Sequence, residues 1–252
     1  MFNVILYLLL ALLAITCAVA PSVYIKRKFG GNLKRIRDGA VVQIIFASIL
    51  NAVLYTVLAI GMGLYEKIEQ NELISILVNT VLLCACVFIG HLIWLNGIVK
   101  KQGETGEALL YGAGYSAAFV FFGYVLSSIA NAVISVMVAV DENAPISNVF
   151  EANITQVSNT DSYTVFLEIL QMLIAVVLEG AIAVTAYKVL LGDAKKYWFA
   201  AAVVLHFVGN AVITYHEIER TYIILIYLAV AITAAGLAYS LIFPAKKKTE
   251  AE

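Results

Sequence analysis

The chain has 252 residues, of which 62% are hydrophobic and only 13% are charged. An ordinary soluble domain has about 45–50% apolar and about 25% charged residues, so this composition excludes a water-soluble globule. The formal net charge is −1, and no excess of basic residues is available to bind nucleic acid. The composition therefore predicts a protein embedded in a lipid bilayer.

Seven apolar stretches are long enough to cross a bilayer as helices, which takes about 20 residues each. In chain order they are about 2–24, 39–64, 73–99, 108–138, 163–191, 197–215 and 221–243. The first stretch is followed, not preceded, by its basic residues, so we interpret it as a retained span and not as a signal peptide. Proline stands only at span ends, which predicts mostly unbroken helices. We expect an all-α polytopic membrane helical bundle, with residues 1–252 forming a single membrane domain.

Basic residues fall unequally on the two sides of these spans. Connecting segments at about 25–38, 100–107, 192–196 and 244–252, together with Lys188, contain all the Lys and Arg residues except Lys67 and Arg220. Since segments rich in Lys and Arg stay in the cytoplasm, the N-terminus is predicted outside and the C-terminus inside. The longest loop, about 139–162, is then acidic and external. We expect it to be a plain connector, with a lid over a cavity mouth as the alternative.

Apart from Lys188 at the inner end of its span, four Glu and His side chains lie within the predicted spans, where an unpaired charge costs several kcal/mol and often marks a functional site. Glu179 and His206 fall near the midplane, His91 slightly to the cytoplasmic side, and Glu168 in the outer third. Glu168 is close enough to the interface to be solvated, and a lone histidine can simply hydrogen-bond a neighbouring carbonyl. The functional interpretation is that Glu179, His91 and His206 converge on one cavity.

Two imidazoles and one carboxylate are a plausible ligand set for zinc or another divalent metal, so we consider Glu179, His91 and His206 as metal ligands. Glu179 and His206 are also the candidate catalytic pair. The sequence holds no HExxH motif that would strengthen this hypothesis.

Other residues suit binding or packing. Asn210 follows His206 by four residues and shares its helix face, so both can address one ligand or partner helix. Gly112 and Gly114, with Ala117 and Ala118, form a small-residue face that favours close helix approach, and Tyr115 stands in its middle. We expect His91, Tyr115 and Asn210 to bind a substrate or partner. The pair Cys84 and Cys86 is interpreted as packing.

Two parts of the chain resemble a known family. One is Gly90-His91, then the Lys100-Lys101 turn, then the segments 107–115 and 127–133; the other is 197–210, which contains His206-x-x-x-Asn210. In this order they resemble the YhfC family of bacterial intramembrane proteases, related to the CAAX-prenyl-protease and bacteriocin-processing membrane peptidases. The resemblance implies a bacterial cytoplasmic membrane, and peptide hydrolysis within it.

The motifs that carry chemistry in that family are altered here. Its first motif, a Glu pair before x-Gly-Arg, corresponds to residues 87–91, where Val87 and Phe88 replace both carboxylates. Its second motif, Gly-His-Gly-Gly-x-Glu, corresponds to residues 114–119, where Tyr115 and Phe119 replace the His and the Glu. The family's glutamate is expected to activate water, and neither Val87 nor Phe88 can move a proton.

We therefore predict a protease-like membrane protein that has lost hydrolysis and binds a membrane protein or a lipid. The alternative is an active intramembrane peptidase, acting on a membrane protein or peptide through a rewired site of Glu179, His91 and His206. Substrate translocation is a third class, and sparse polar residues in unbroken spans favour it least.

Overall fold

The computed structural model describes residues 2–64, 68, 70–99, 104–140, 161–192, 194–215 and 219–244. Within that part of the chain, all regular structure is helical. Seven of its helical spans are long and apolar enough to cross a membrane, which confirms the predicted all-α bundle. The predicted outer loop lies almost wholly outside the described residues.

The spans follow the predicted order closely. They are α1 (Phe2–Phe29); α2 (Lys34–Val42), η1 (Gln43–Leu50), α3 (Asn51–Thr56) and η2 (Val57–Gly61); α5 (Glu72–Trp94) and η3 (Leu95–Val99); α6 (Thr105–Val120), η4 (Phe121–Val125) and α7 (Leu126–Val140); α9 (Ser162–Leu191); α10 (Tyr197–Thr214); and α11 (Arg220–Ile242). The η segments are π-helical stretches. The residues joining η1 and η4 to their neighbours keep right-handed helical dihedral angles, so these spans continue through them.

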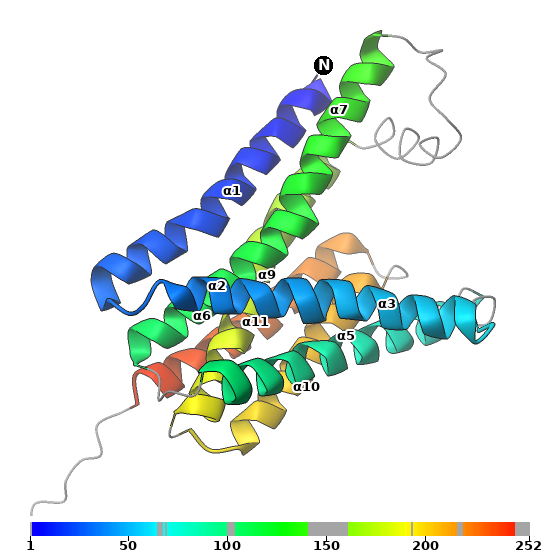
Figure 1. Ribbon diagram of the computed structural model, residues 1–252. Helices are drawn as coiled ribbons and strands as arrows, with labels where there is room; N and C mark the ends of the chain where they lie inside the picture. Colours follow the sequence, from blue (N-terminus) through cyan, green and yellow to red (C-terminus); the bar gives the residue numbers. More distant parts are fainter. Residues whose placement is uncertain are drawn as a thin grey trace, which may run out of the picture.

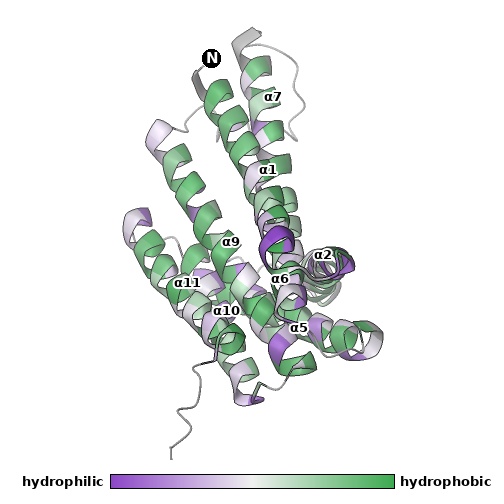
Figure 2. Ribbon diagram, turned by 90° about the vertical axis from the view of Figure 1, so that its left-hand side faces the viewer, coloured by the Kyte–Doolittle hydropathy of each residue, from purple (hydrophilic) through white to green (hydrophobic). Residues whose placement is uncertain are grey.

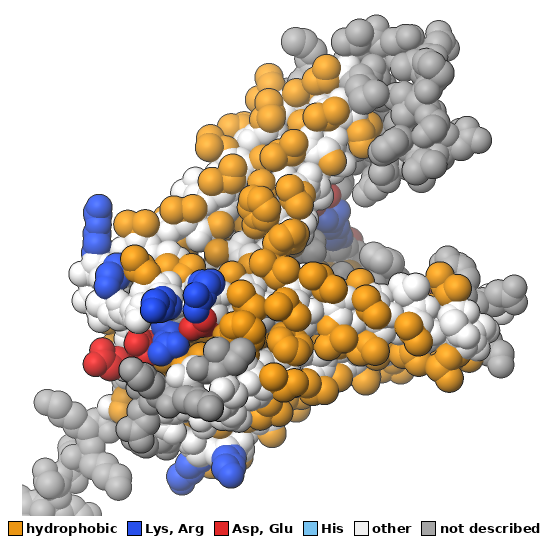
Figure 3. All heavy atoms as spheres, in the orientation of Figure 1, with side chains coloured by type: hydrophobic (Ala, Val, Ile, Leu, Met, Phe, Trp, Pro, Cys, Tyr) orange, Lys and Arg blue, Asp and Glu red, His pale blue; other side chains and the backbone are white. Residues whose placement is uncertain are grey.

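The helices are arranged around α6 and α9. The α1 and α7 helices run together, away from the span that begins with α2 and from α5 (Figure 1). Apolar residues extend along the lengths of the spans (Figure 2), as expected for helices whose outer faces meet lipid. Lys and Arg side chains gather where α2 begins (Figure 3). We call this the basic end of the bundle, and it is the end predicted to face the cytoplasm.

Close backbone approach positions α6 against its two neighbours. A Cβ atom added to Gly114 would collide with the carbonyl group of Ile36 in α2, and one added to Gly39 would collide with that of Tyr111 in α6. A Cβ atom on Gly112 would lie 2.6 Å from a carbonyl oxygen of α9. The predicted small-residue face is therefore where three helices meet at backbone distance.

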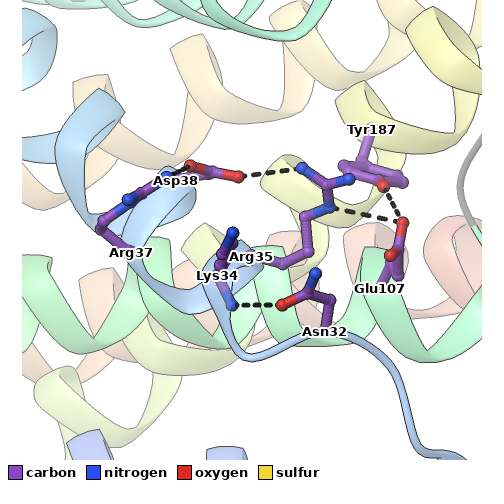
Figure 4. A network of polar contacts seen from close by, with 7 residues as sticks. All are labelled: Asn32, Lys34, Arg35, Arg37, Asp38, Glu107 and Tyr187. Carbon is purple, nitrogen blue, oxygen red and sulfur yellow. Dashed lines mark hydrogen bonds and ion pairs between the residues drawn. The ribbon is translucent and has the colours of Figure 1, made fainter. Parts of the chain in front are cut away.

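A polar network at the basic end fixes the same three helices (Figure 4). Arg35 of α2 places Nη1 3.0 Å from Asp38 Oδ2 and Nε 3.3 Å from Glu107 Oε2 of α6. The Tyr187 hydroxyl of α9 donates to the same Glu107 oxygen at 3.0 Å. Arg35 and Asp38 are buried, and removing one member of a buried ion pair is strongly destabilising. The network therefore holds α2, α6 and α9 in one register.

The substitution Gly114→Ala tests this packing. We expect it to lower the free energy of unfolding by about 1–3 kcal/mol, because the added methyl group forces the α2 and α6 backbones apart. The measurement is SDS-induced unfolding of the purified protein, followed by circular dichroism. Gly236→Ala is the matched control, since a Cβ atom there meets nothing within 4 Å. Equal stability of the two variants would contradict the close approach.

Candidate functional site

The structure brings Glu179 of α9 and His206 of α10 together in the core. Glu179 Oε2 lies 3.3 Å from His206 Nε2. Both residues are only 1% exposed. Glu179 Oε2 makes no hydrogen bond with any described residue. Its contact with His206 is therefore electrostatic, because the angles do not suit a hydrogen bond. Two residues that were predicted at similar depth therefore face each other.

Cys84 of α5 contacts the other edge of the same imidazole. Its Sγ lies 3.2 Å from His206 Nδ1, within hydrogen-bond distance for sulfur. The sequence interpretation of Cys84 as packing missed this polar contact. One signal was present: residues 84, 88 and 91 are spaced i, i+4 and i+7, which places Cys84 on the helix face that carries His91.

His91 is buried in the same core but makes a different contact. Its Nδ1 lies 2.7 Å from the Tyr111 hydroxyl of α6, while its Nε2 makes no hydrogen bond with a described residue. Phe88 packs edge-on against both imidazoles, with ring centroids 6.0 Å from His91 and 5.7 Å from His206. Thus an apolar ring contacts both histidines at a position where the family resemblance implies a carboxylate.

Tyr115 is fully buried beside these groups. Its ring centroid lies 5.2 Å from that of His91, and its hydroxyl is within electrostatic range of Glu179 and Cys84. The hydroxyl oxygen makes no hydrogen bond with a described residue. Buried polar atoms without partners are rare in native proteins, so this arrangement requires an explanation. We call Cys84, His91, Tyr115, Glu179 and His206 the core polar cluster.

Two other candidate residues lie apart from this cluster. The Asn210 side-chain amide donates to the backbone carbonyl of His206 at 2.9 Å, so it hydrogen-bonds within its own helix. Glu168 lies near the beginning of α9, 3.9 Å from Arg220 of α11. The predicted role of Asn210 in partner binding stays a prediction.

In this arrangement the described side chains of the core polar cluster do not form a set of three ligands around one position. Glu179 and Cys84 contact opposite nitrogens of His206, so they cannot both join an ion held by one of those nitrogens. His91 Nδ1 is engaged by Tyr111, while its Nε2 makes no hydrogen bond with a described residue. Among the residues that the structure describes, no group of three or more His, Cys, Asp and Glu side chains is placed to hold a metal. The predicted zinc-ligand set of Glu179, His91 and His206 stays a prediction for metal analysis.

Solvent does not reach the core polar cluster in this conformation. All five side chains belong to buried residues, and His91 and Tyr115 are fully inaccessible. Hydrolysis requires a water molecule within hydrogen-bond reach of a general base. In this conformation the cluster is a sealed polar contact between α5, α6, α9 and α10.

The fold and these contacts define a polytopic membrane protein with a polar core. The model of the YhfC intramembrane metalloprotease family matches residues 9–233. Because this match covers most of the chain, the protein belongs to the YhfC family, as the resemblance implied. Neither a curated protein nor a solved structure matches the chain significantly. The matched region extends from α1 into α11 and includes every member of the core polar cluster.

A double-mutant cycle tests the contact between Cys84 and His206. We expect the destabilisations caused by Cys84→Ala and His206→Ala to be non-additive by about 0.5–3 kcal/mol, because the two side chains share one contact. The free energy of unfolding in SDS is the measurement. Cys86→Ala is the control, since this buried cysteine has no described contact with His206, and its effect should add to that of His206→Ala. Additivity in both pairs would show that the thiol and the imidazole do not interact.

Proposed function

We propose that this YhfC-family protein does not hydrolyse peptides and acts by binding a membrane protein or a lipid. The observation that carries the proposal is the engagement of both His206 nitrogens, by Glu179 on one edge and Cys84 on the other. With a protein side chain against each nitrogen, we expect this imidazole to serve helix packing and not metal binding. The setting we propose is the cytoplasmic membrane of a bacterium.

The residues at the altered motif positions support the same conclusion. Val87 and Phe88, where the resemblance implies a pair of carboxylates, are buried apolar side chains in the main hydrophobic core. Phe119 packs against that core from α6. General acid–base catalysis needs a titratable group at the reacting centre, and none of these three side chains can take or give a proton.

The core polar cluster then has a structural role. Hydrogen bonds between helices inside a bilayer contribute about 1 kcal/mol each. The Cys84–His206 contact therefore stabilises the pairing of α5 with α10, and the electrostatic contact of Glu179 joins α9 to the same imidazole. Membership of the family supplies the fold, while the altered residues fill its core with apolar side chains.

An active peptidase is the second candidate, and one observation favours it. His91 Nε2, Tyr115 Oη and Glu179 Oε2 are all buried without a hydrogen-bond partner among the described residues. A conformation that opened this region would expose a base and two further polar groups to water. Glu179 would then be the general base, with His91 and His206 as ligands or electrophiles.

A cleavage assay separates the two candidates. The purified protein is reconstituted in vesicles with fluorophore-labelled transmembrane peptides, and product formation is followed over time. We expect no cleavage above the protein-free rate, and no change with Glu179→Gln or with the control Glu168→Gln. Cleavage that Glu179→Gln abolishes and Glu168→Gln preserves would overturn the proposed function.

A further inference from the structure

A second polar site lies outside the core polar cluster. A cavity of about 390 Å³ is formed by residues of α1, the α6–α7 span, α9 and α11. Its polar lining includes Tyr124, Ser127, Asn131, Glu168, Gln171 and Arg220. Cavities of about 300–1,000 Å³ are typical ligand sites, and ionisable groups within a membrane are by default functional. In a chain that is 62% hydrophobic, this gathering of polar side chains indicates a binding site.

The cavity lies in the half of the bundle opposite the basic end. Arg220 is the first residue of α11, and Glu168 is the seventh residue of α9. At 1.5 Å per residue, Glu168 is about 9 Å from the beginning of its helix. Since both charges stand in the first turns of their spans, we expect them near the boundary between the headgroup region and the hydrocarbon core. Under the predicted topology, this is the outer leaflet.

The charges of the cavity are adjacent but loosely paired. Arg220 Nη2 lies 3.9 Å from Glu168 Oε1 and 3.5 Å from Gln171 Oε1. A close ion pair between a guanidinium and a carboxylate has distances of about 2.7–2.9 Å. The two side chains also remain 40% and 27% exposed. The Arg220 guanidinium and the Glu168 carboxylate thus lie side by side, and both can still form hydrogen bonds with a ligand.

We propose that this cavity binds the headgroup of a phospholipid that carries a primary ammonium group beside its phosphate, namely phosphatidylethanolamine. The inference rests on the proposed function and names its lipid ligand. The Arg220 guanidinium binds the phosphate through its forked donors, and the Glu168 carboxylate accepts hydrogen bonds from the ammonium group. A short ethylene link joins the phosphate to the ammonium group of this lipid. The two ligand charges are therefore close enough to reach Arg220 and Glu168 at the same time.

Uncharged groups complete the site. The Tyr124 hydroxyl interacts with the Gln171 side chain and is within electrostatic range of Glu168 and Arg220. Asn131 lines the cavity from α7, so its side-chain amide is available to donate to the phosphate and ester oxygens. The Ser127 hydroxyl, which also lines the cavity, donates to the Gly123 carbonyl at 2.6 Å. Neutral hydrogen-bonding groups of this kind fix a headgroup without changing the charge balance.

The surrounding surface favours a lipid over a soluble ligand. Leu126 and Ile129, on the helix that contributes Ser127, are each 45% exposed, and Phe166 of α9 is 52% exposed. Such apolar side chains beside a headgroup site provide a surface for acyl chains.

The charge pattern also selects among headgroups. Phosphatidylglycerol offers no cation to Glu168, and the quaternary ammonium of phosphatidylcholine cannot donate a hydrogen bond to it. Phosphatidylethanolamine matches both charges of the cavity.

Native mass spectrometry of the full chain in detergent tests the proposal. Bound lipids are counted during titration with phosphatidylethanolamine, phosphatidylcholine and phosphatidylglycerol of identical acyl chains, and soluble phosphoethanolamine is added as a competitor. Because hydrogen bonds to charged groups contribute about 1.5–3 kcal/mol, we expect phosphatidylethanolamine to bind about tenfold more tightly than the other two lipids. Soluble phosphoethanolamine should not displace it at equal concentration.

Matched variants assign the preference to the cavity. Glu168→Gln should abolish it, because this carboxylate distinguishes the headgroups, and Arg220→Gln should weaken the binding of all three lipids, which share the phosphate. Arg27→Gln and Glu104→Gln, which make the same charge changes at exposed sites of the basic end, should change neither. Thermal unfolding of each variant shows whether it is folded.

Three results would overturn the proposal: equal affinity of the wild-type protein for the three lipids, a preference that survives Glu168→Gln, or displacement by soluble phosphoethanolamine at equal concentration. The first and third results are measured on the wild-type protein, so they do not depend on whether a variant folds. Each would leave the cleavage assay and the proposed loss of hydrolysis unaffected. Conversely, cleavage that depends on Glu179 would overturn the proposed function without changing the measured lipid preference.

Discussion

The close approach of α6 to α2 and α9 is the contact on which the rest of the structure depends. Glycines 39, 112 and 114 allow it, because a side chain at any of them would meet a neighbouring backbone. The Arg35–Glu107–Tyr187 network then fixes the register of the same three helices at the basic end. With α6 placed in this way, Tyr111 and Tyr115 reach the core beside His91. Backbone packing therefore brings the buried polar groups of α6 beside those of α5.

The spans and the depths of the buried polar residues could be predicted from the sequence, because both depend only on how far a residue lies along its helix across the bilayer. Apolar length located the spans, and distance from the span ends placed Glu179 and His206 at similar depth, where the structure shows them in contact. The rotation of each helix about its own axis could not be predicted, because apolar residues surround every span. The contact of Cys84 with His206 and the grouping of Glu168 with Arg220 both depend on that rotation.

Membership of the family establishes the fold of this protein, whereas catalysis depends on the chemistry of a few side chains. The match to the YhfC intramembrane metalloprotease family covers residues 9–233 and accounts for the fold. Catalysis depends on a few side chains, and a fold can persist after they change. Here Phe88 contacts both buried histidines, and His206 is engaged at both nitrogens. The second polar site, around Arg220, offers a binding chemistry that does not require these histidines.

We propose that His206 serves protein contacts and not a metal ion. Elemental analysis of the detergent-purified wild-type protein, beside a His91→Ala/His206→Ala double variant, tests it without knowledge of any substrate. The account predicts divalent metal well below one equivalent per chain, at the same level in both proteins. About one equivalent of zinc in the wild-type protein, lost in a double variant that remains folded, would contradict it.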